Sequence, residues 1–303
     1  MDIGPQSKGD DPFTKKCRLL QSKYRSQTLK ELCGKGPKET SDTLYGNMLK
    51  NGQKTGSNFI PGAAFRYAKQ RVEAKKSNKY LTIEEFRLFN NMLSSMPMCF
   101  NLFSDLRELL MNNKDEGTKV IKQLFQEIPW IETAHEIEVE FIPIPIADYT
   151  NDKSAFDAVI FAENRKGIKS LISIETKYTD LLGSNTAANS DIKNDLVEKG
   201  GFFSNKLKEE LRNRGYRQIH RNFLLTYAYA KKHGMTNFAN IIISPEEDKL
   251  SGIEISEMQR EMTAYSDRIL KISLQEFVSR GKNCGQQVIM AVMDKFWDRY
   301  LDY

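Results

Sequence analysis

The sequence lacks the residue clusters that indicate structural zinc, a disulfide framework or a nucleotide-triphosphate motor. Its four cysteines are scattered with no C-x-x-C pair, and its three histidines do not cluster. Gly52 and Lys54 are out of register with the G-x-x-x-x-G-K-[ST] pattern of a phosphate-binding loop. Separated cysteines are typical of reduced proteins, so we expect a cytoplasmic location.

Long apolar runs are also missing. No apolar stretch approaches 18 residues, and the N-terminus leads into no apolar segment, so we expect neither a membrane span nor a secretory signal. No internal repeat is present. A chain of 303 residues is long enough for one large α/β core with an appendage, or for two domains.

Charge is present but unevenly distributed. The net charge is only +5, yet residues 14–79 hold sixteen Lys and Arg against four Asp and Glu, which gives +12. Residues 80–140 hold five against eleven, which gives −6. The basic block also contains Tyr24, Tyr45, Phe59, Phe65 and Tyr67. Such a mixture can neutralise phosphates and stack on bases, or it can be a helical cap whose lysines are merely solvated.

The most informative residues are Asp157 and the run Glu175-Thr176-Lys177. They lie in two short, apolar, β-prone segments, 154–162 and 170–178, joined by a polar stretch with a glycine that predicts a hairpin turn. Residues two apart in a strand face the same side, so Glu175 and Lys177 share a face. Antiparallel pairing through the turn would place Asp157 across from them.

Charged side chains are rare in apolar strands unless they are paired or bound to metal. Facing carboxylates of Asp157 and Glu175 predict a Mg²⁺ site, with Mn²⁺ as a substitute, and the backbone carbonyl of Thr176 can add a ligand. Lys177 would then neutralise a phosphate or orient the attacking water. The alternative is an ordinary Glu–Lys pair on a solvated strand face.

An aspartate on one strand followed by Glu-x-Lys on the next resembles the PD-(D/E)xK nuclease superfamily. The resemblance covers roughly residues 80–245, and Phe156 stands where the proline of the motif's name would be. Residues 94–101 and 218–222 resemble segments of a bacterial branch of these nucleases. The resemblance implies an α/β fold with a restriction-endonuclease-like α-β-β-β-α-β core, a mixed sheet flanked by helices, and metal-dependent phosphodiester hydrolysis.

The hydrophobic pattern fits that core. Residues 136–142 alternate polar and apolar side chains as a strand does, and residues 238–243 form an apolar run typical of a buried strand. Helices are predicted at 82–94, 99–111, 117–127 and 205–232, the last broken near Gly215, and 254–303 should be mainly helical. Residues 180–204 predict a substrate-facing loop or a short extra helix. We therefore expect a basic, partly helical appendage at 1–79, a nuclease core at 80–250 and a C-terminal helical extension at 251–303 packed on the core.

The superfamily often has an additional acid from a helix before the first strand. Glu140 is our candidate for an additional metal ligand. Solvated surface charge is an alternative for it and for the other acids nearby, which are Glu108, Glu116, Glu127 and Glu138.

Gln218 and Arg221 are three residues apart on a predicted helix and should share a face. In the superfamily, the helix after the Glu-x-Lys strand often brings a polar residue to the active site. Arg221 could grip a phosphate with two hydrogen bonds, whereas the alternative is a surface arginine on a basic helix.

Together these features predict a Mg²⁺-dependent nuclease. We expect an endonuclease rather than an exonuclease, and a DNA rather than an RNA substrate. A role in bacterial defence against foreign DNA extrapolates from such nucleases, and a homodimer or a gating protein partner is compatible with the sequence. The alternative function is a non-catalytic module that binds nucleic acid or a protein partner and retains a vestigial site.

Overall fold

The computed structural model describes the whole chain except residues 1, 181, 183–185 and 188–189. The chain divides into two compact units. Unit 1 comprises Met1–Leu109, Tyr178–Asp180 and Gln275–Tyr303, and unit 2 comprises Leu110–Lys177 and Leu181–Leu274. The three-part division of the sequence stays a prediction.

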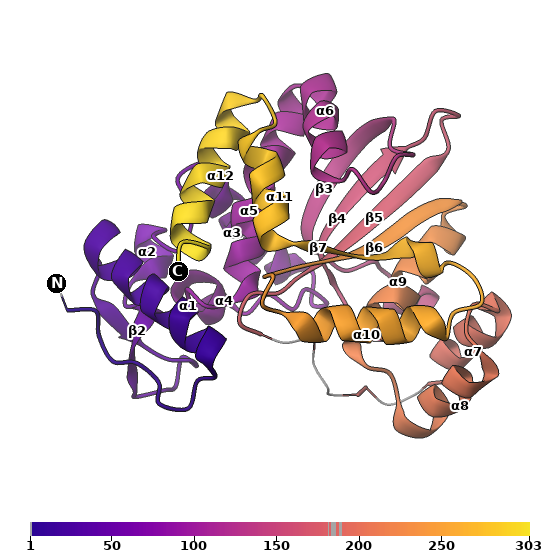
Figure 1. Ribbon diagram of the computed structural model, residues 1–303, viewed down its shortest axis with the longest axis horizontal. Coiled ribbons are helices and arrows are strands. Elements are labelled where there is room, and N and C mark those ends of the chain that lie inside the picture. The colour runs from indigo at the N-terminus through magenta and orange to yellow at the C-terminus, as the bar shows by residue number, and fades with distance from the viewer. Residues whose placement is uncertain (1, 181, 183–185, 188–189) are drawn as a thin grey trace. The chain divides into compact units, whose positions relative to one another are not determined.

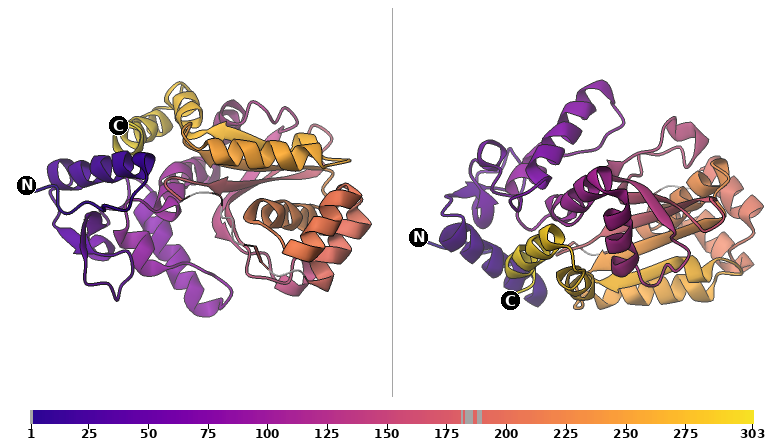
Figure 2. Two further views of the ribbon diagram at one scale, coloured as in Figure 1. Left: turned by 60° about the horizontal axis from the view of Figure 1, so that its bottom comes forward. Right: turned by 90° about the horizontal axis from the view of Figure 1, so that it is seen from above.

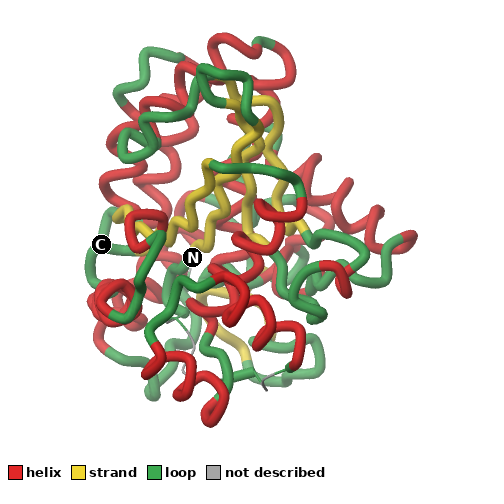
Figure 3. The backbone as a smooth tube through the Cα atoms, turned by 90° about the vertical axis from the view of Figure 1, so that its right-hand side faces the viewer, coloured by secondary structure: helices red, strands yellow, loops and turns green. Residues whose placement is uncertain are grey.

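Unit 2 is built on a five-stranded mixed sheet in the order β3-β4-β5-β6-β7 (Figures 1 and 3). The strands are β3 (Thr133–Phe141), β4 (Phe156–Glu163), β5 (Lys169–Thr176), β6 (Asn237–Ser244) and β7 (Ile269–Ser273). Strands β3, β4 and β5 pair antiparallel, whereas β5, β6 and β7 pair parallel. The direction of pairing therefore changes at β5, the strand that contains Glu175.

The β4–β5 hairpin has the predicted form. Its turn is held by the side chain of Asn164, which accepts hydrogen bonds from the backbone N–H groups of Lys166 and Ile168. Gly167 has a φ of +70°, which a residue without a side chain adopts at low cost. Ala158 pairs with Ile174. The two strands and the turn expected from the sequence are confirmed.

Unit 2 has helices that contact this sheet, namely α6, α9 and α10, and helices α7 and α8 that group with α9. They are α6 (Lys114–Leu124), α7 (Asp191–Gly200), α8 (Asn205–Arg214), α9 (Gln218–Lys232) and α10 (Lys249–Arg260), with short 3₁₀ turns η2 (Ile146–Asp148) and η3 (Ser266–Arg268). Helix α9 contacts β5 and β6, and α7 and α8 are grouped with it (Figure 2). The predicted break near Gly215 is confirmed, because α8 ends at Arg214 and α9 begins at Gln218.

The buried residues beneath α9 form the hydrophobic core that fixes the helix on the sheet. Val159 of β4 and Ile242 of β6 belong to the same cluster as Phe223 of α9 and Phe202. Phe202 and Phe223 meet edge to face with ring centroids 5.2 Å apart. This contact packs the second turn of α9 against the segment between α7 and α8, while Val159 and Ile242 form the sheet side of the same core.

Two parts of unit 2 differ in how well the sequence predicts them. The polar stretch after β5 contains the short extra helix that was one of the two expectations, namely α7. Strand β7, in contrast, lies in the segment expected to be mainly helical, and it pairs parallel with β6 at the edge of the sheet. The segment is only five residues long, and its middle residue is Lys271, so its pattern is too weak to be distinguished from helix by periodicity alone.

Unit 1 is mainly helical with one small antiparallel sheet. Its elements are α1 (Pro12–Lys23), η1 (Tyr24–Thr28), β1 (Cys33–Lys35), β2 (Leu44–Leu49), α2 (Gly52–Thr55), α3 (Ala64–Ser77), α4 (Glu85–Asn90), α5 (Ser95–Asn112, whose end lies in unit 2), α11 (Leu274–Lys282) and α12 (Gln287–Tyr300). Phe296 and Tyr300 of α12 are fully buried and stack at 4.5 Å, so the C-terminal aromatics serve for packing.

The basic block of unit 1 differs from expectation in its aromatic residues. Phe59 and Tyr67 are buried in the core, Phe59 against Phe89 and Tyr67 against Phe100, so these two rings do not stack on bases. All four cysteines are free thiols. Among the described residues, none of the helices combines the length and the apolar character needed to cross a membrane.

Candidate active site

The predicted residues of the hairpin come together at one end of β4 and β5. Because Ala158 pairs with Ile174, Asp157 lies level with Glu175 on the neighbouring strand. The backbone N–H and the hydroxyl of Thr176 both donate to Oδ2 of Asp157, at 2.8 and 2.9 Å. Asp157 therefore points toward the Glu-x-Lys strand and not away from it.

Glu175 is the centre of a compact polar cluster. The Lys177 ammonium lies 2.8 Å from its Oε1, and the side chains of Glu175 and Lys177 are only 6 and 9 % exposed. Gln218, the first residue of α9, donates to the same Oε1 at 2.6 Å and accepts from Lys177 at 3.2 Å. Asn222, one turn further along α9, donates to Oε2 at 3.0 Å. Strand β5 and the start of α9 thus build the site together.

A buried polar network below Glu175 fixes α9 in register with β5. The hydroxyls of Ser173 and Thr226 are 2.6 Å apart, and the Asn240 amide donates to Ser173 at 2.9 Å. Thr226 also donates to the backbone carbonyl of Asn222 at 2.7 Å. Ser173 is two residues before Glu175 and so lies on the same face of the strand. The network determines which turn of α9 faces Glu175.

Electrostatics at Asp157 are strongly perturbed. Burial, and then the nearby carboxylate of Glu175, raise the pKa of Asp157 to about 7, although Lys177 and the two hydrogen bonds from Thr176 act in the opposite direction. Two carboxylates therefore lie close enough to repel each other, and Lys177 forms an ion pair with one of them, Glu175. Perturbation of this kind is concentrated at functional sites.

Glu140 lies on β3 beside this pair. Val139 pairs with Ala158 and Phe141 with Phe156, so Glu140 is level with Asp157. Glu140 is buried and has a φ of +55°, a conformation that costs energy for a residue with a side chain. Within the residues that the structure describes, no group of three or more His, Cys, Asp and Glu is arranged to hold a metal. The role of Glu140 as an additional metal ligand stays a prediction.

The structure separates the two predicted residues of α9. Gln218 contacts Glu175 and Lys177, whereas Arg221 has no contact with either in the described residues, and its Nε is buried without a hydrogen-bond partner there. The second α9 residue at the site is Asn222, which the sequence analysis missed. The signal was available, because Asn222 follows Gln218 by four residues and hence lies on the same helix face.

Comparison with protein families gives a match to a family model described as the PD-(D/E)XK nuclease superfamily, over residues 8–302. The match covers nearly the whole chain. The protein belongs to the PD-(D/E)XK nuclease superfamily. Neither the curated proteins nor the solved structures gave a match.

Membership of the superfamily confirms the resemblance seen in the sequence and implies a metal-dependent nuclease. The mixed five-stranded sheet with flanking helices agrees with it. The donor set fits a hard divalent cation, since two carboxylate side chains and a backbone carbonyl are oxygen ligands. The raised pKa of Asp157 supports this fit, because a cation between the carboxylates would relieve their repulsion.

Proposed function

We propose that the protein is a Mg²⁺-dependent endonuclease that hydrolyses phosphodiester bonds in DNA. The observations that support the proposal are the contact of Asp157 with Thr176 across the β4–β5 hairpin and the ion pair of Glu175 with Lys177 at the end of β5. Two acids and a lysine at the ends of neighbouring strands match the residue types that the superfamily uses for hydrolysis.

Asp157, Glu175 and the Thr176 carbonyl would hold the metal, with Glu140 as an additional acid and Mn²⁺ as a substitute ion. Bound Mg²⁺ supplies charge that polarises the scissile phosphate and lowers the pKa of an attacking water. Asp157 is held in place for this role by two hydrogen bonds from Thr176, which leave its carboxylate at the end of the strand.

Protein side chains around the metal ligands handle the charge of the substrate. Lys177 would stabilise negative charge as it develops on the phosphate and position the water. Gln218 contacts both Lys177 and Glu175 and so fixes the ammonium relative to the carboxylate. Arg221, with an unpaired Nε on the same helical turn, would grip a neighbouring phosphate.

The substrate, the location and the biological role are inferred from the sequence. We infer a DNA substrate, a cytoplasmic location and a role in bacterial defence against foreign DNA, with a homodimer or a gating partner. The basic block at 14–79 would add sequence-independent attraction to phosphates.

A non-catalytic binding module is the second candidate. One observation favours a binding module: both carboxylate oxygens of Glu175 are already engaged. Oε1 pairs with the Lys177 ammonium and accepts a hydrogen bond from Gln218, and Oε2 accepts one from Asn222. A catalytic site has to exchange some of these contacts for metal. Titration calorimetry with Mg²⁺ separates the two functions: a nuclease binds the ion and loses that binding in Asp157→Ala, whereas a vestigial site gives no heat dependent on Asp157.

Cleavage by variants tests the nuclease directly. Lys177→Ala and Glu175→Gln should each lower the rate of DNA cleavage by about 10²-fold or more, since each removes a preorganised charge at the reacting phosphate. Lys169→Ala is the matched control, because Lys169 is an exposed lysine at the start of the same strand. Linear, circular and single-stranded DNA and RNA should be assayed with Mg²⁺, Mn²⁺ or EDTA. Undiminished cleavage by Lys177→Ala of confirmed fold would refute the mechanism.

A further inference from the structure

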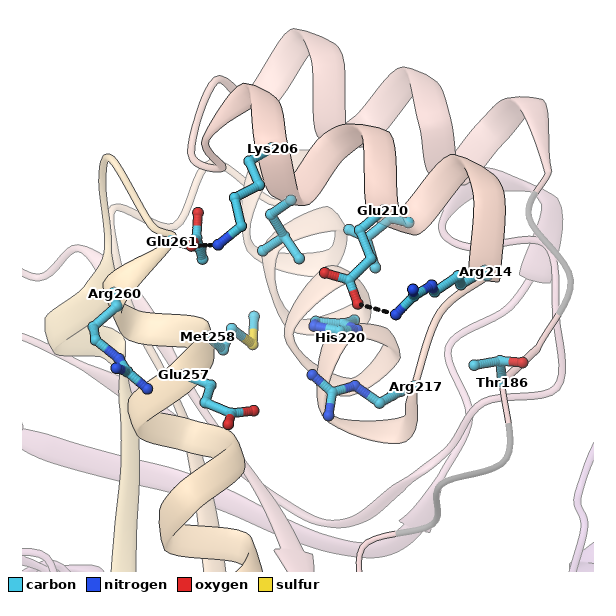
Figure 4. A pocket seen from close by; sticks show the side chains of 13 residues that line it. Thr186, Lys206, Glu210, Arg214, Arg217, His220, Glu257, Met258, Arg260 and Glu261 are labelled. Carbon is cyan, nitrogen blue, oxygen red and sulfur yellow. Dashed lines mark hydrogen bonds and ion pairs between the residues drawn. The ribbon is translucent and has the colours of Figure 1, made fainter.

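A polar cavity lies in unit 2, on the side of the first turn of α9 that carries His220. Its volume is about 520 Å³, within the range of pockets for small organic ligands. Helix α8 forms one wall, α10 another, and the start of α9 the floor (Figure 4). None of Asp157, Glu175 and Lys177 lines it.

His220 is the residue that needs a ligand. Its side chain lines the cavity between those of Glu210 and Arg217, yet it is only 2 % exposed (Figure 4). Neither of its ring nitrogens has a hydrogen-bond partner among the described residues. An unsatisfied buried polar group is unfavourable, so most buried polar groups in proteins have partners.

The charge state of His220 restricts what that partner can be. Burial, and then the charge of Arg217, lower the pKa of His220 to about 3, so the ring is neutral at physiological pH. A neutral imidazole has one N–H donor and one acceptor nitrogen. The edge of a nucleobase offers donors and acceptors side by side, which suits such a ring better than a bare anion does.

Two cations at the rim, Arg214 and Lys206, pair with carboxylates that another anion can replace. Arg214 is 3.6 Å from Glu210, and Lys206 is 2.6 Å from Glu261, both in exposed or partly exposed ion pairs. Arg260 projects from the opposite wall. Exposed ion pairs of this kind contribute little to stability, so a phosphate can replace the carboxylate at little cost.

The inner walls are apolar where the rim is charged. Leu207 and Leu211 of α8 and Met258 of α10 line the cavity and are buried. Flat apolar groups pack well on leucine and on the polarisable sulfur of methionine. A planar face, a polar edge and a phosphate are the three parts of a nucleotide, and the cavity has a matching surface for each.

We propose that this cavity binds one nucleotide, with the base against His220 and Met258 and the phosphate at Arg214 and Arg260. The proposal rests on the proposed function, because a nucleotide unit of a bound strand is one source of the ligand and a free mononucleotide is the other. Access of the base to the imidazole nitrogens requires a rim side chain to move, and Arg214, exposed and 3.6 Å from Glu210, can do so without breaking a buried contact. Arg217 and His220 flank Gln218, so the ligand is held by the same helical turn that contacts Glu175.

Binding without cleavage tests the proposal, with EDTA present throughout. The probes are a fluorescent single-stranded oligonucleotide, the four nucleoside 5′-monophosphates, and deoxyribose 5-phosphate as a phosphate without a base. The variants are His220→Phe, which keeps the ring and removes both nitrogens, and Arg214→Ala, which removes an exposed cation. Arg212→Ala is the matched control, an exposed arginine on α8 that pairs with Glu198 and does not line the cavity.

We expect His220→Phe to weaken binding of the nucleotide probe about tenfold and Arg214→Ala about three- to tenfold, with the control within twofold. Deoxyribose 5-phosphate should respond to Arg214→Ala but not to His220→Phe. An effect on the oligonucleotide alone identifies a strand as the source, and an effect on the mononucleotides alone identifies a free nucleotide. If neither probe responds to either variant, the proposal is wrong and His220 is a packing residue.

The two proposals fail separately. A protein that binds nucleotide through His220 and Arg214 but cleaves no nucleic acid refutes the proposed function alone. A protein that cleaves DNA while both variants bind every probe as the wild type does refutes the nucleotide cavity alone. Because Arg214 is exposed, its variant remains informative even if His220→Phe does not fold.

Discussion

At the scale of single residues, the candidate site holds the carboxylates of Asp157 and Glu175 close enough to repel each other. Asp157 ionises with difficulty because it is shielded from water and faces another carboxylate. A site that holds like charges together is less stable than a core made for packing, and it gains from any cation that binds there. The energetic cost at Asp157 should therefore be visible in the pH dependence of stability.

Asp157→Asn should stabilise the metal-free protein at pH 8 and have a smaller effect at pH 5. The folded-state pKa of Asp157, about 7, lies above its ordinary value of 3.8, so the wild type loses stability as the pH rises from about 4 to about 7. Asparagine keeps the acceptor for Thr176 and removes the charge. We expect a gain of about 1 kcal/mol or more at pH 8, or roughly 2–4 °C in Tm, measured by thermal unfolding in EDTA.

The exposed Asp195, paired with Lys199 on α7, provides the control substitution Asp195→Asn, which should change Tm equally at both pH values. A gain from Asp157→Asn that is the same at pH 5 and pH 8 would contradict the electrostatic explanation.

Which residues of the candidate site can be predicted from the sequence depends on how far apart they lie along the chain. Asp157, Glu175 and Lys177 were predictable because a single hairpin turn joins their strands and period two fixes their faces. Asn222 could have been found from its spacing of four residues from Gln218. The lack of hydrogen-bond partners for the ring nitrogens of His220 among the described residues was not predictable, because it depends on the rotation of α9. That rotation is set by Phe223 in the core and by the Ser173–Thr226 contact, neither of which has a signature in the sequence.

At the scale of elements, α7 is tied to the loop before β4 by a buried ion pair. Lys193 is 4 % exposed and lies 2.7 Å from Oδ2 of Asp152. The side chain of Asp152 also accepts from the Ser154 N–H and the Thr150 hydroxyl through Oδ1. Burial raises the pKa of Asp152, but the hydrogen bonds from Lys193 and Ser154 outweigh it and leave the pKa below its ordinary value.

Lys193→Met should destabilise the protein by about 2 kcal/mol, because it leaves the Asp152 carboxylate partly buried without its cation. The contribution of Asp152 is present above pH 4 and is lost as the pH falls further, so the variant and the wild type should converge in acid. Chemical denaturation at pH 7 and pH 3.5 measures both effects. The exposed pair member Lys199→Met should cost less than 0.5 kcal/mol, and a similar loss for both variants would show that burial is not the cause.

Element prediction from the sequence succeeded where helices and strands have strong patterns and failed at β7. The β4–β5 hairpin and the break between α8 and α9 follow from local turn chemistry at Asn164, Gly167 and Gly215. Strand β7 forms by parallel pairing with the edge of β6, to which it is connected through α10. This pairing depends on tertiary structure and not on the local sequence of the strand.

At the scale of the whole molecule, charge and chain organisation are the distinguishing features. The positive charge of the sequence is concentrated in residues 14–79, which belong to unit 1, whereas the acids and the lysine of the candidate site belong to unit 2. Residues 275–303 group with the N-terminal residues in unit 1, a pattern that composition along a sequence cannot reveal because composition is read in contiguous blocks.

If the basic block contacts DNA, replacing Lys15 and Lys16 by glutamine should weaken duplex binding and flatten its salt dependence. Each lost phosphate contact lowers the slope of log K against log salt by about 0.9, so the pair should lower it by up to roughly 1.8. Lys166 and Lys169, exposed at the hairpin turn, are the matched pair. Fluorescence anisotropy between 50 and 300 mM salt, roughly the range in which such contacts are lost, measures both slopes, and equal slopes for the two double variants would exclude this block from the interface.

The uneven spacing of the site along the chain has a consequence for folding. Asp157 and Thr176 are 19 residues apart, whereas Gln218 and Asn222 lie 43 and 47 residues from Glu175. Because short loops close first, the hairpin can form before the helix arrives with the amides that cover Glu175. During that interval the carboxylates of Asp157 and Glu175 face each other without the hydrogen bonds from Gln218 and Asn222. Dilute Mg²⁺ should therefore speed refolding of the wild type and leave refolding of Asp157→Asn unaffected, as measured by stopped-flow fluorescence. The ion would then assist in assembling the very strands that later hold it.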